Sequence, residues 1–179
     1  DVDGTNAVSL LYSFLLEHYP NVSYYIPDRY GEGYGVSLKG IDFAEDNDVS
    51  LMIALDCGIK AVDQVDYAAG KNIDFIICDH HLPGKSIPKA VAILNPLQSD
   101  CTYPDKYLSG CGIGFKLAQA LTQAIALVNE TQSVEAWTQL MMLPKANLLA
   151  PPRGGKKHRA RAATYTLDRL ACWQAGQRA

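Results

Sequence analysis

The sequence predicts an α/β fold in which a parallel β-sheet carries helices on both faces. Short runs of β-branched and apolar residues alternate with segments whose apolar residues recur at helical spacing. This order, helix then strand repeated, is typical of parallel strands joined by crossover helices. A chain of 179 residues, 48% of them hydrophobic, is also long enough to bury one sizeable core.

Four segments have the spacing of amphipathic helices. In the first, apolar residues such as Leu11 and Phe14 recur at helical intervals, and Pro20 with Asn21 ends the pattern. The predicted helices are Thr5–Glu17, a short segment around Asp42, Lys60–Ala69 and Gly114–Val128.

Three runs favour buried strands because they are short, apolar and rich in β-branched or aromatic residues. They read VSYYIP at 22–27, SLMIALD at 50–56 and DFIICD at 74–79. A further run, AVAIL at 90–94, is consistent with one more strand.

The charge distribution divides the chain in two. Residues 1–140 carry 8 basic and 18 acidic side chains, a net charge of −10, whereas residues 141–179 carry 8 and 1, a net charge of +7. The segment PPRGGKKHRARAA has no hydrophobic period, which is typical of a solvated tail, with a basic nucleic-acid-binding arm as the alternative. We therefore expect a core over 1–143 and a basic tail of low order over 144–179.

Five cysteines without a C-x-x-C pair favour small buried side chains in a reducing compartment over a structural zinc site. The sequence contains no apolar run of the length of a membrane span, and it starts on a charged residue rather than on a basic signal sequence. We expect a soluble protein located in the cytoplasm.

Aspartates follow the predicted strands, at the edge of a parallel sheet where ligands gather. Asp56 ends one strand, Asp79 ends another, and Asp1 with Asp3 directly precedes the first helix. Four carboxylates at one edge repel each other, so a divalent cation is the economical neutraliser. Each aspartate alone has a simpler explanation as a helix cap.

Two histidines, His80 and His81, directly follow Asp79. Imidazole beside carboxylate suits manganese, iron or zinc better than calcium. This donor set fits a two-metal phosphoesterase, in which two ions clamp the attacking and leaving oxygens.

The motifs DVDGT, a strand ending in DCG, and DHH together resemble the signature of the DHH phosphoesterase family. Two further segments are similar to the RecJ-type nucleases of that family: YYIPDRYGEGYGVS at 24–37 and NPLQSDCTYPDKYLSGCGIGFKLAQAL at 95–121. The resemblance covers residues 1–143. It implies a metal-dependent 5′ to 3′ exonuclease that acts on single-stranded DNA in repair and recombination, with two manganese or magnesium ions.

The resemblance also implies roles for individual residues. Asp1 and Asp3 would hold different ions, Asp56 would bridge both, and His80 would join Asp3 on the second ion. His81 would donate to an oxygen of the scissile phosphate, and Asp79 would orient the neighbouring imidazole.

Two basic residues are candidates for substrate phosphates, Arg29 and Lys116. Arg29 lies in a Gly- and Tyr-rich loop, and its alternative role is an ion pair with Asp28 or Glu32. The SGCGIG segment opens a helix whose amides suit an anion, with packing of Gly112 against a strand as the alternative.

The chain departs from the family pattern near its end. The family supplies a further metal-binding aspartate after the long helix, but the corresponding segment MLPKANLLAPPRGG contains no acid, and the DHH-associated second domain is absent from this sequence. A catalytically incomplete nucleic-acid-binding fragment therefore stays open as an alternative. So does a family member that hydrolyses short oligonucleotides.

A phosphatase of the haloacid-dehalogenase type is a third alternative, since such enzymes also begin with D-x-D-G-T and use the first aspartate as nucleophile. Against this alternative, Asn6 stands where such proteins have an apolar residue, and DHH is not part of their pattern.

Overall fold

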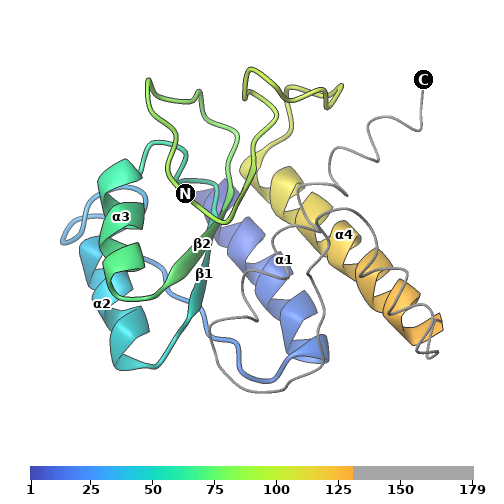
Figure 1. The fold of residues 1–179 in the computed structure, drawn as a ribbon, viewed down its shortest axis with the longest axis horizontal. Coiled ribbons are helices and arrows are strands. Elements are labelled where there is room, and N and C mark those ends of the chain that lie inside the picture. The colour runs from blue at the N-terminus through green and yellow to red at the C-terminus, as the bar shows by residue number, and fades with distance from the viewer. Residues whose placement is uncertain (131–179) are drawn as a thin grey trace.

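The structure is a computed structural model that describes residues 1–130. Three parallel strands lie in the order β1-β2-β3. Helices cover both faces of the sheet, as predicted (Figure 1). The elements along the chain are α1 (Val2–His18), α2 (Leu38–Asp46), β1 (Leu51–Leu55), α3 (Val62–Gly70), β2 (Asp74–Cys78), β3 (Ala92–Leu94) and α4 (Gly110–Glu130).

The register of the sheet is set by β2, whose residues are the most deeply buried of the three strands. Leu51 pairs with Asp74 and Leu55 pairs with Cys78, so β1 and β2 end at the same level. Because parallel strands that end together bring their following residues to one edge, the two strand-end aspartates are neighbours.

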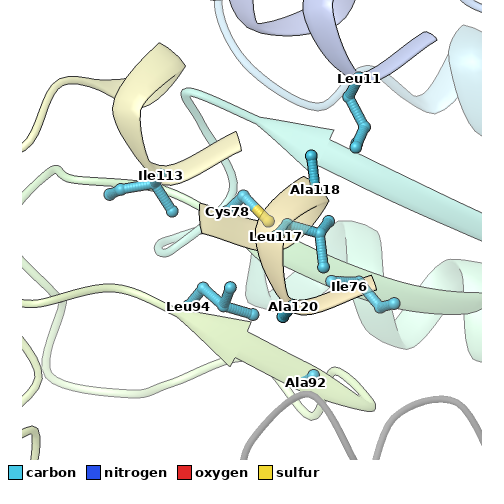
Figure 2. Packing of buried hydrophobic residues seen from close by; sticks show 9 residues of the cluster. All are labelled: Leu11, Ile76, Cys78, Ala92, Leu94, Ile113, Leu117, Ala118 and Ala120. Carbon is cyan, nitrogen blue, oxygen red and sulfur yellow. The ribbon is translucent and has the colours of Figure 1, made fainter. Parts of the chain in front are cut away.

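Helices α1 and α4 pack against one face of the sheet (Figure 1). The cluster beneath them joins side chains from both helices to β2 and β3, with Leu117 lying between Cys78 and Ile76 (Figure 2). Its buried members are Leu11, Ile76, Cys78, Ala92, Leu94, Ile113, Leu117, Ala118 and Ala120. This burial fixes the N-terminal ends of α1 and α4 relative to the strand ends.

Helices α2 and α3 cover the opposite face. Their apolar side chains, among them Ile41, Val65 and Ala68, bury Phe75 and Ile77 of β2. The side-chain hydroxyl of Ser37 accepts a hydrogen bond from the Gly40 amide, and this N-cap starts α2.

The predicted strand at 22–27 is wrong. No strand occupies these residues, and the side chains of Tyr24 and Ile26 are 58% and 53% exposed. Tyr25 instead packs on α2, with its ring 5.2 Å from that of Phe43 and in contact with Gly40. The run has the residue types of a strand, but within residues 1–130 it pairs with no neighbouring strand.

The other predicted elements are confirmed, with shifted ends. The first and last helices begin earlier than predicted, at Val2 and Gly110. Asp1 is the N-cap of α1, and Asp3 accepts hydrogen bonds from the first amides of α4. Residue run 90–94 contributes the three residues of β3. The tail expected over 144–179 lies outside the described residues.

In the described part of the chain, no helix is long and apolar enough to cross a membrane. Cys57, Cys78, Cys101 and Cys111 are all free thiols, and the fifth cysteine, Cys172, lies outside the described residues.

Candidate functional site

The site lies where β1 and β2 end and where α1 and α4 begin. Asp56 follows β1 and Asp79 follows β2, and both extend the ladder: the Asp56 amide donates to the carbonyl of Cys78, and the Asp79 amide donates to that of Leu94. Both residues are therefore anchored by a backbone hydrogen bond to the end of the neighbouring strand.

Asp56 is the buried centre of the site. Its side chain is 4% exposed, its backbone φ is +61°, and its Oδ1 atom accepts no hydrogen bond from the described residues. Burial, together with the charge of Asp3, raises the pKa of Asp56. A buried carboxylate oxygen without a donor is costly, which is the situation that a bound cation relieves.

Two glycines allow the helices to approach Asp56. A Cβ atom added to Gly110, the first residue of α4, would lie 2.3 Å from Oδ1 of Asp56, and one added to Gly4 in α1 would lie 3.3 Å from Oδ2. The same Gly4 position is 3.5 Å from Oδ1 of Asp1. Asp1 caps α1 by accepting a hydrogen bond from the Gly4 amide at 2.9 Å. The carboxylates of Asp1 and Asp56 thus both lie next to Gly4.

The Nε2 nitrogen of His80 faces the carboxylates of Asp56 and Asp3. Its Nδ1 atom lies 3.0 Å from the carbonyl oxygen of Leu108, which can only accept, so Nδ1 carries the proton. In the neutral imidazole Nε2 is then a lone pair, and it lies 3.1 Å from Oδ1 of Asp56 and 3.8 Å from Oδ2 of Asp3. A metal ion bound to this nitrogen would offset the charge of the two carboxylates that face it.

Asp3 is held by the first turn of α4. Its two carboxylate oxygens accept hydrogen bonds from the amides of Gly110 and Cys111, each at 2.7 Å. Although partial burial opposes the effect, the Cys111 and Gly110 amides lower the pKa of Asp3, so it is a carboxylate. Each oxygen keeps a second lone pair for a metal.

The predicted anion site at the SGCGIG segment is therefore filled by the protein's own Asp3. The alternative role for Gly112, packing against a strand, is wrong: the nearest atoms to a Cβ added there belong to Leu108 and Ser109. Gly114 has that role instead, because its added Cβ would lie 3.5 Å from Leu55 of β1.

Asp79 positions His81. Oδ1 of Asp79 accepts hydrogen bonds from the amides of His80 and His81 and lies 2.7 Å from Nδ1 of His81. Oδ2 accepts from the Ile59 amide at 2.9 Å. Since a carboxylate can only accept, Nδ1 of His81 carries a proton, and its Nε2 is the nitrogen left for another partner.

The donor set fits a divalent cation. Ligand atoms of Asp56, His80 and His81 all lie within 4.8 Å of one another, and Oδ2 of Asp3 approaches the same imidazole nitrogen. The Oδ1 atom of Asp56, which has no hydrogen-bond donor among the described residues, and the Nε2 atom of His80 are two groups that one metal ion could bind together. Mixed oxygen and imidazole donors suit manganese.

Arg29 lies beside this cluster. It lines a cavity of about 200 Å³ that also contacts Asp1, Asp56 and Tyr34, and its guanidinium carbon lies 6.0 Å from the centre of the Tyr34 ring. The alternative ion pairs with Asp28 and Glu32 do not form. Within residues 1–130, Glu32 instead accepts hydrogen bonds from Tyr25, Ser37 and the Asp28 amide.

The hydrogen bonds of the described residues link Lys116 to Gln119 on its own helix, at 2.9 Å, and not to the acidic cluster. It lies six residues beyond Gly110, about 9 Å along α4 at the usual helical rise. Lys116 is therefore not among the side chains that the structure brings together.

Sequence reasoning missed several supporting groups. The Leu108 carbonyl contacts Nδ1 of His80, and the Ile59 amide donates to Asp79. The ring of Tyr34 lies beside that of His81, and Nδ2 of Asn95 donates to the His81 carbonyl at 2.9 Å. Asn95 is buried at the end of β3 and had a usable signal, because it is a polar residue directly after a strand.

Comparison with known proteins identifies the class. Residues 1–144 match the DHH family, N-terminal domain, and the chain belongs to this family. This excludes the haloacid-dehalogenase alternative, and Asp1 serves as the N-cap of α1.

Within the family, the similar curated proteins are exonucleases. The chain is 42% identical over 121 residues to the single-stranded-DNA-specific exonuclease RecJ of Bacillus subtilis, covering 68% of this chain and 15% of that protein. It is 38% identical over 124 residues to RecJ of Escherichia coli, covering 68% and 22%. The chain thus spans about a fifth of the length of these relatives.

A solved structure of exonuclease RecJ bound to manganese superposes with a TM-score of 0.62 at 28% identity, covering 70% of this chain and 31% of that one. This likeness confirms the predicted fold, and the manganese in that structure is one of the metals that mixed carboxylate and imidazole donors can bind.

Proposed function

We propose that this chain carries the metal-dependent core of a RecJ-like exonuclease that hydrolyses single-stranded DNA from the 5′ end. The observation that carries the proposal is the contact between His80 and Asp56, in which an imidazole nitrogen lies 3.1 Å from a buried carboxylate oxygen that accepts no hydrogen bond from the described residues. The similar curated proteins support the choice of single-stranded DNA as substrate.

Asp1, Asp3, Asp56 and His80 are the proposed ligands of two divalent ions, manganese or magnesium, with Asp56 shared between them. When bound, such ions supply an activated nucleophile and neutralise the charge on the transferred phosphoryl group. The chain itself holds its ligands in place through the sheet end and through the α4 amides on Asp3.

His81 is the proposed catalytic side chain at the scissile phosphate. To donate from Nε2 to a phosphate oxygen, its imidazole must carry protons on both nitrogens. The carboxylate of Asp79 at 2.7 Å stabilises that cation and fixes the direction of the ring. Asp79, buried and bonded to three amides, is the positioning residue.

Arg29 is the proposed partner of a substrate phosphate, since its exposed guanidinium lines the cavity next to Asp56 without an ion pair to Asp28 or Glu32. Lys116 would contact a phosphate only if the bound DNA strand continued along α4. Free thiols and the similarity to RecJ support a location in the cytoplasm and a role in DNA repair and recombination.

The test is manganese-dependent release of nucleotides from a 5′-labelled single-stranded DNA by this chain and its His81→Ala variant. His18→Ala, at the far end of α1, is the matched control. We expect release by the parent and the control, and a loss of at least about 100-fold in His81→Ala. DNA binding without hydrolysis in every variant would show an incomplete nuclease core and refute the proposed activity of this chain.

A further inference from the structure

Tyr34 presents a largely exposed aromatic ring beside the reactive histidine. Its side chain is 61% exposed, yet its ring centre lies 6.3 Å from that of His81, with the two planes at 83°. The guanidinium of Arg29 lies 6.0 Å from the same ring centre. Core packing does not explain an aromatic ring that stays largely in solvent and lies near both an imidazole and a guanidinium.

The backbone on both sides of Tyr34 is arranged to hold this position. Gly33 and Gly35 have φ values of +87° and +88°. A Cβ atom added to Gly33 would meet nothing within 4 Å, and one added to Gly35 would meet only Cys57 at 4.0 Å. The glycines are therefore required for the backbone conformation and not for space, and what this conformation sets is the position of Tyr34.

The rest of the loop is anchored. The Glu32 amide donates to the Asp28 carbonyl at 2.7 Å, and the Glu32 carboxylate accepts from Tyr25 and Ser37. Ser37 in turn caps α2. The Tyr34 ring is thus carried by a loop that is tied to a helix of the core.

We propose that Tyr34 is a stacking platform for the nucleobase next to the scissile phosphate. The inference rests on the proposed function, because a phosphate at His81 and Arg29 brings its own base to the neighbouring ring. Bases stack on aromatic side chains largely without regard to sequence. In a duplex each base is already stacked and paired, so only an unpaired terminal base is free to reach Tyr34. Stacking on this ring would therefore favour the binding of single-stranded over double-stranded DNA.

The experiment measures equilibrium binding of a 3′-labelled, 5′-phosphorylated oligo(dT) with phosphorothioate linkages by fluorescence anisotropy, with manganese present. A matched strand carries abasic residues at its 5′ end. The variants of the full chain are Tyr34→Leu, which removes the π face, and Tyr34→Phe, which keeps it. Tyr19→Leu is the control, an equally exposed tyrosine at the opposite end of α1.

We expect Tyr34→Leu to weaken binding of the normal strand by about 5- to 100-fold and to leave binding of the abasic strand unchanged. Tyr34→Phe and Tyr19→Leu should stay within about twofold of the parent. Gly33→Ala, which strains the loop but leaves the ring intact, should weaken binding of the normal strand too, whereas Gly70→Ala should not.

Equal binding of the normal strand by Tyr34→Leu and the parent would overturn the stacking role alone, provided that the parent binds and hydrolyses DNA. A loss in Tyr34→Phe as large as in Tyr34→Leu would overturn it in favour of a hydrogen bond from the hydroxyl. Failure of the parent to bind either strand would overturn the proposed function together with this inference.

Discussion

The Nε2 atom of His80 and the Oδ1 atom of Asp56 lie 3.1 Å apart, and this buried oxygen accepts no hydrogen bond from the described residues. A buried carboxylate oxygen without a positive partner is costly, and a bound metal ion would make these two atoms a pair of ligands. The free energy of unfolding of this protein should therefore depend on divalent metal more than that of a chain with an ordinary surface carboxylate.

Asp56→Asn should separate these two effects. Asparagine tolerates the positive φ of 61°, and it replaces a buried carboxylate whose pKa is raised by burial, so the metal-free variant should be about 1 kcal/mol more stable than the parent. Manganese at about 100 times its Kd should stabilise the parent by about 2.7 kcal/mol and the variant hardly at all. Thermal unfolding with and without manganese measures both differences.

Asp48→Asn is the matched control for Asp56→Asn, since Asp48 is an exposed aspartate with a φ of 55°. Asp48→Asn should leave the stabilisation of the protein by manganese unchanged. A parent protein whose melting temperature does not respond to manganese would contradict the metal site as a whole, whereas a full response in Asp56→Asn would remove only Asp56 from the ligand set.

Gly110→Ala should destabilise the protein by several kcal/mol. The new Cβ would lie 2.3 Å from Oδ1 and 2.5 Å from Cβ of Asp56, so α4 or the end of β1 must shift. Gly112→Ala, two residues further along the same helix, meets nothing closer than 3.4 Å and should be neutral or stabilise by up to about 1 kcal/mol. Urea unfolding of the two variants gives the comparison, and equal effects would refute the close approach of α4 to Asp56.

The sheet and its helices could be predicted from local patterns because buried strands and amphipathic helices leave periodic signals. The run at 22–27 shows the limit of such signals. Its valine, tyrosines and isoleucine are good strand formers, but a strand also needs a partner, and the pattern within six residues carries no information about one. In the structure Tyr25 packs on α2 instead.

The site was predictable to the extent that it follows strand ends. Asp56 and Asp79 are found in this way, and His80 with His81 follows directly. The hydrogen bonds from the Gly110 and Cys111 amides to Asp3 could not be found in this way, because they join residues more than 100 positions apart. Such contacts depend on how α1 packs against α4, which no local pattern specifies.

Asp79→Asn should weaken the interaction that orients the His81 ring. Asparagine has one acceptor oxygen, so it cannot serve the Ile59 amide and the His80–His81 segment together, and burial makes the lost bond cost about 1–3 kcal/mol. We expect nuclease activity to fall about 10- to 100-fold. Asp74→Asn, at the other end of β2, should change neither the free energy of unfolding nor the nuclease activity. Full activity in Asp79→Asn would show that His81 needs no carboxylate partner.

Glu32 should make the stability of the protein depend on acid. The hydroxyl of Ser37, the Asp28 amide and the hydroxyl of Tyr25 lower the pKa of Glu32 below its ordinary value of 4.5. A carboxyl whose pKa is depressed by folding stabilises the native state above its unfolded pKa, and this stabilisation is lost as the pH falls through the folded pKa.

Glu32→Gln should therefore be less stable than the parent at neutral pH, and the difference should shrink as the pH falls below 4.5. The effect is expected to be smaller than that of Gly110→Ala, because Glu32 lies close to solvent. Glu17→Gln, on the exposed side of α1, is the control and should show no such convergence. Urea titrations across this pH range measure the gap. A gap that stays constant into acid would mean that the Glu32 carboxylate does not hold the loop that carries Tyr34.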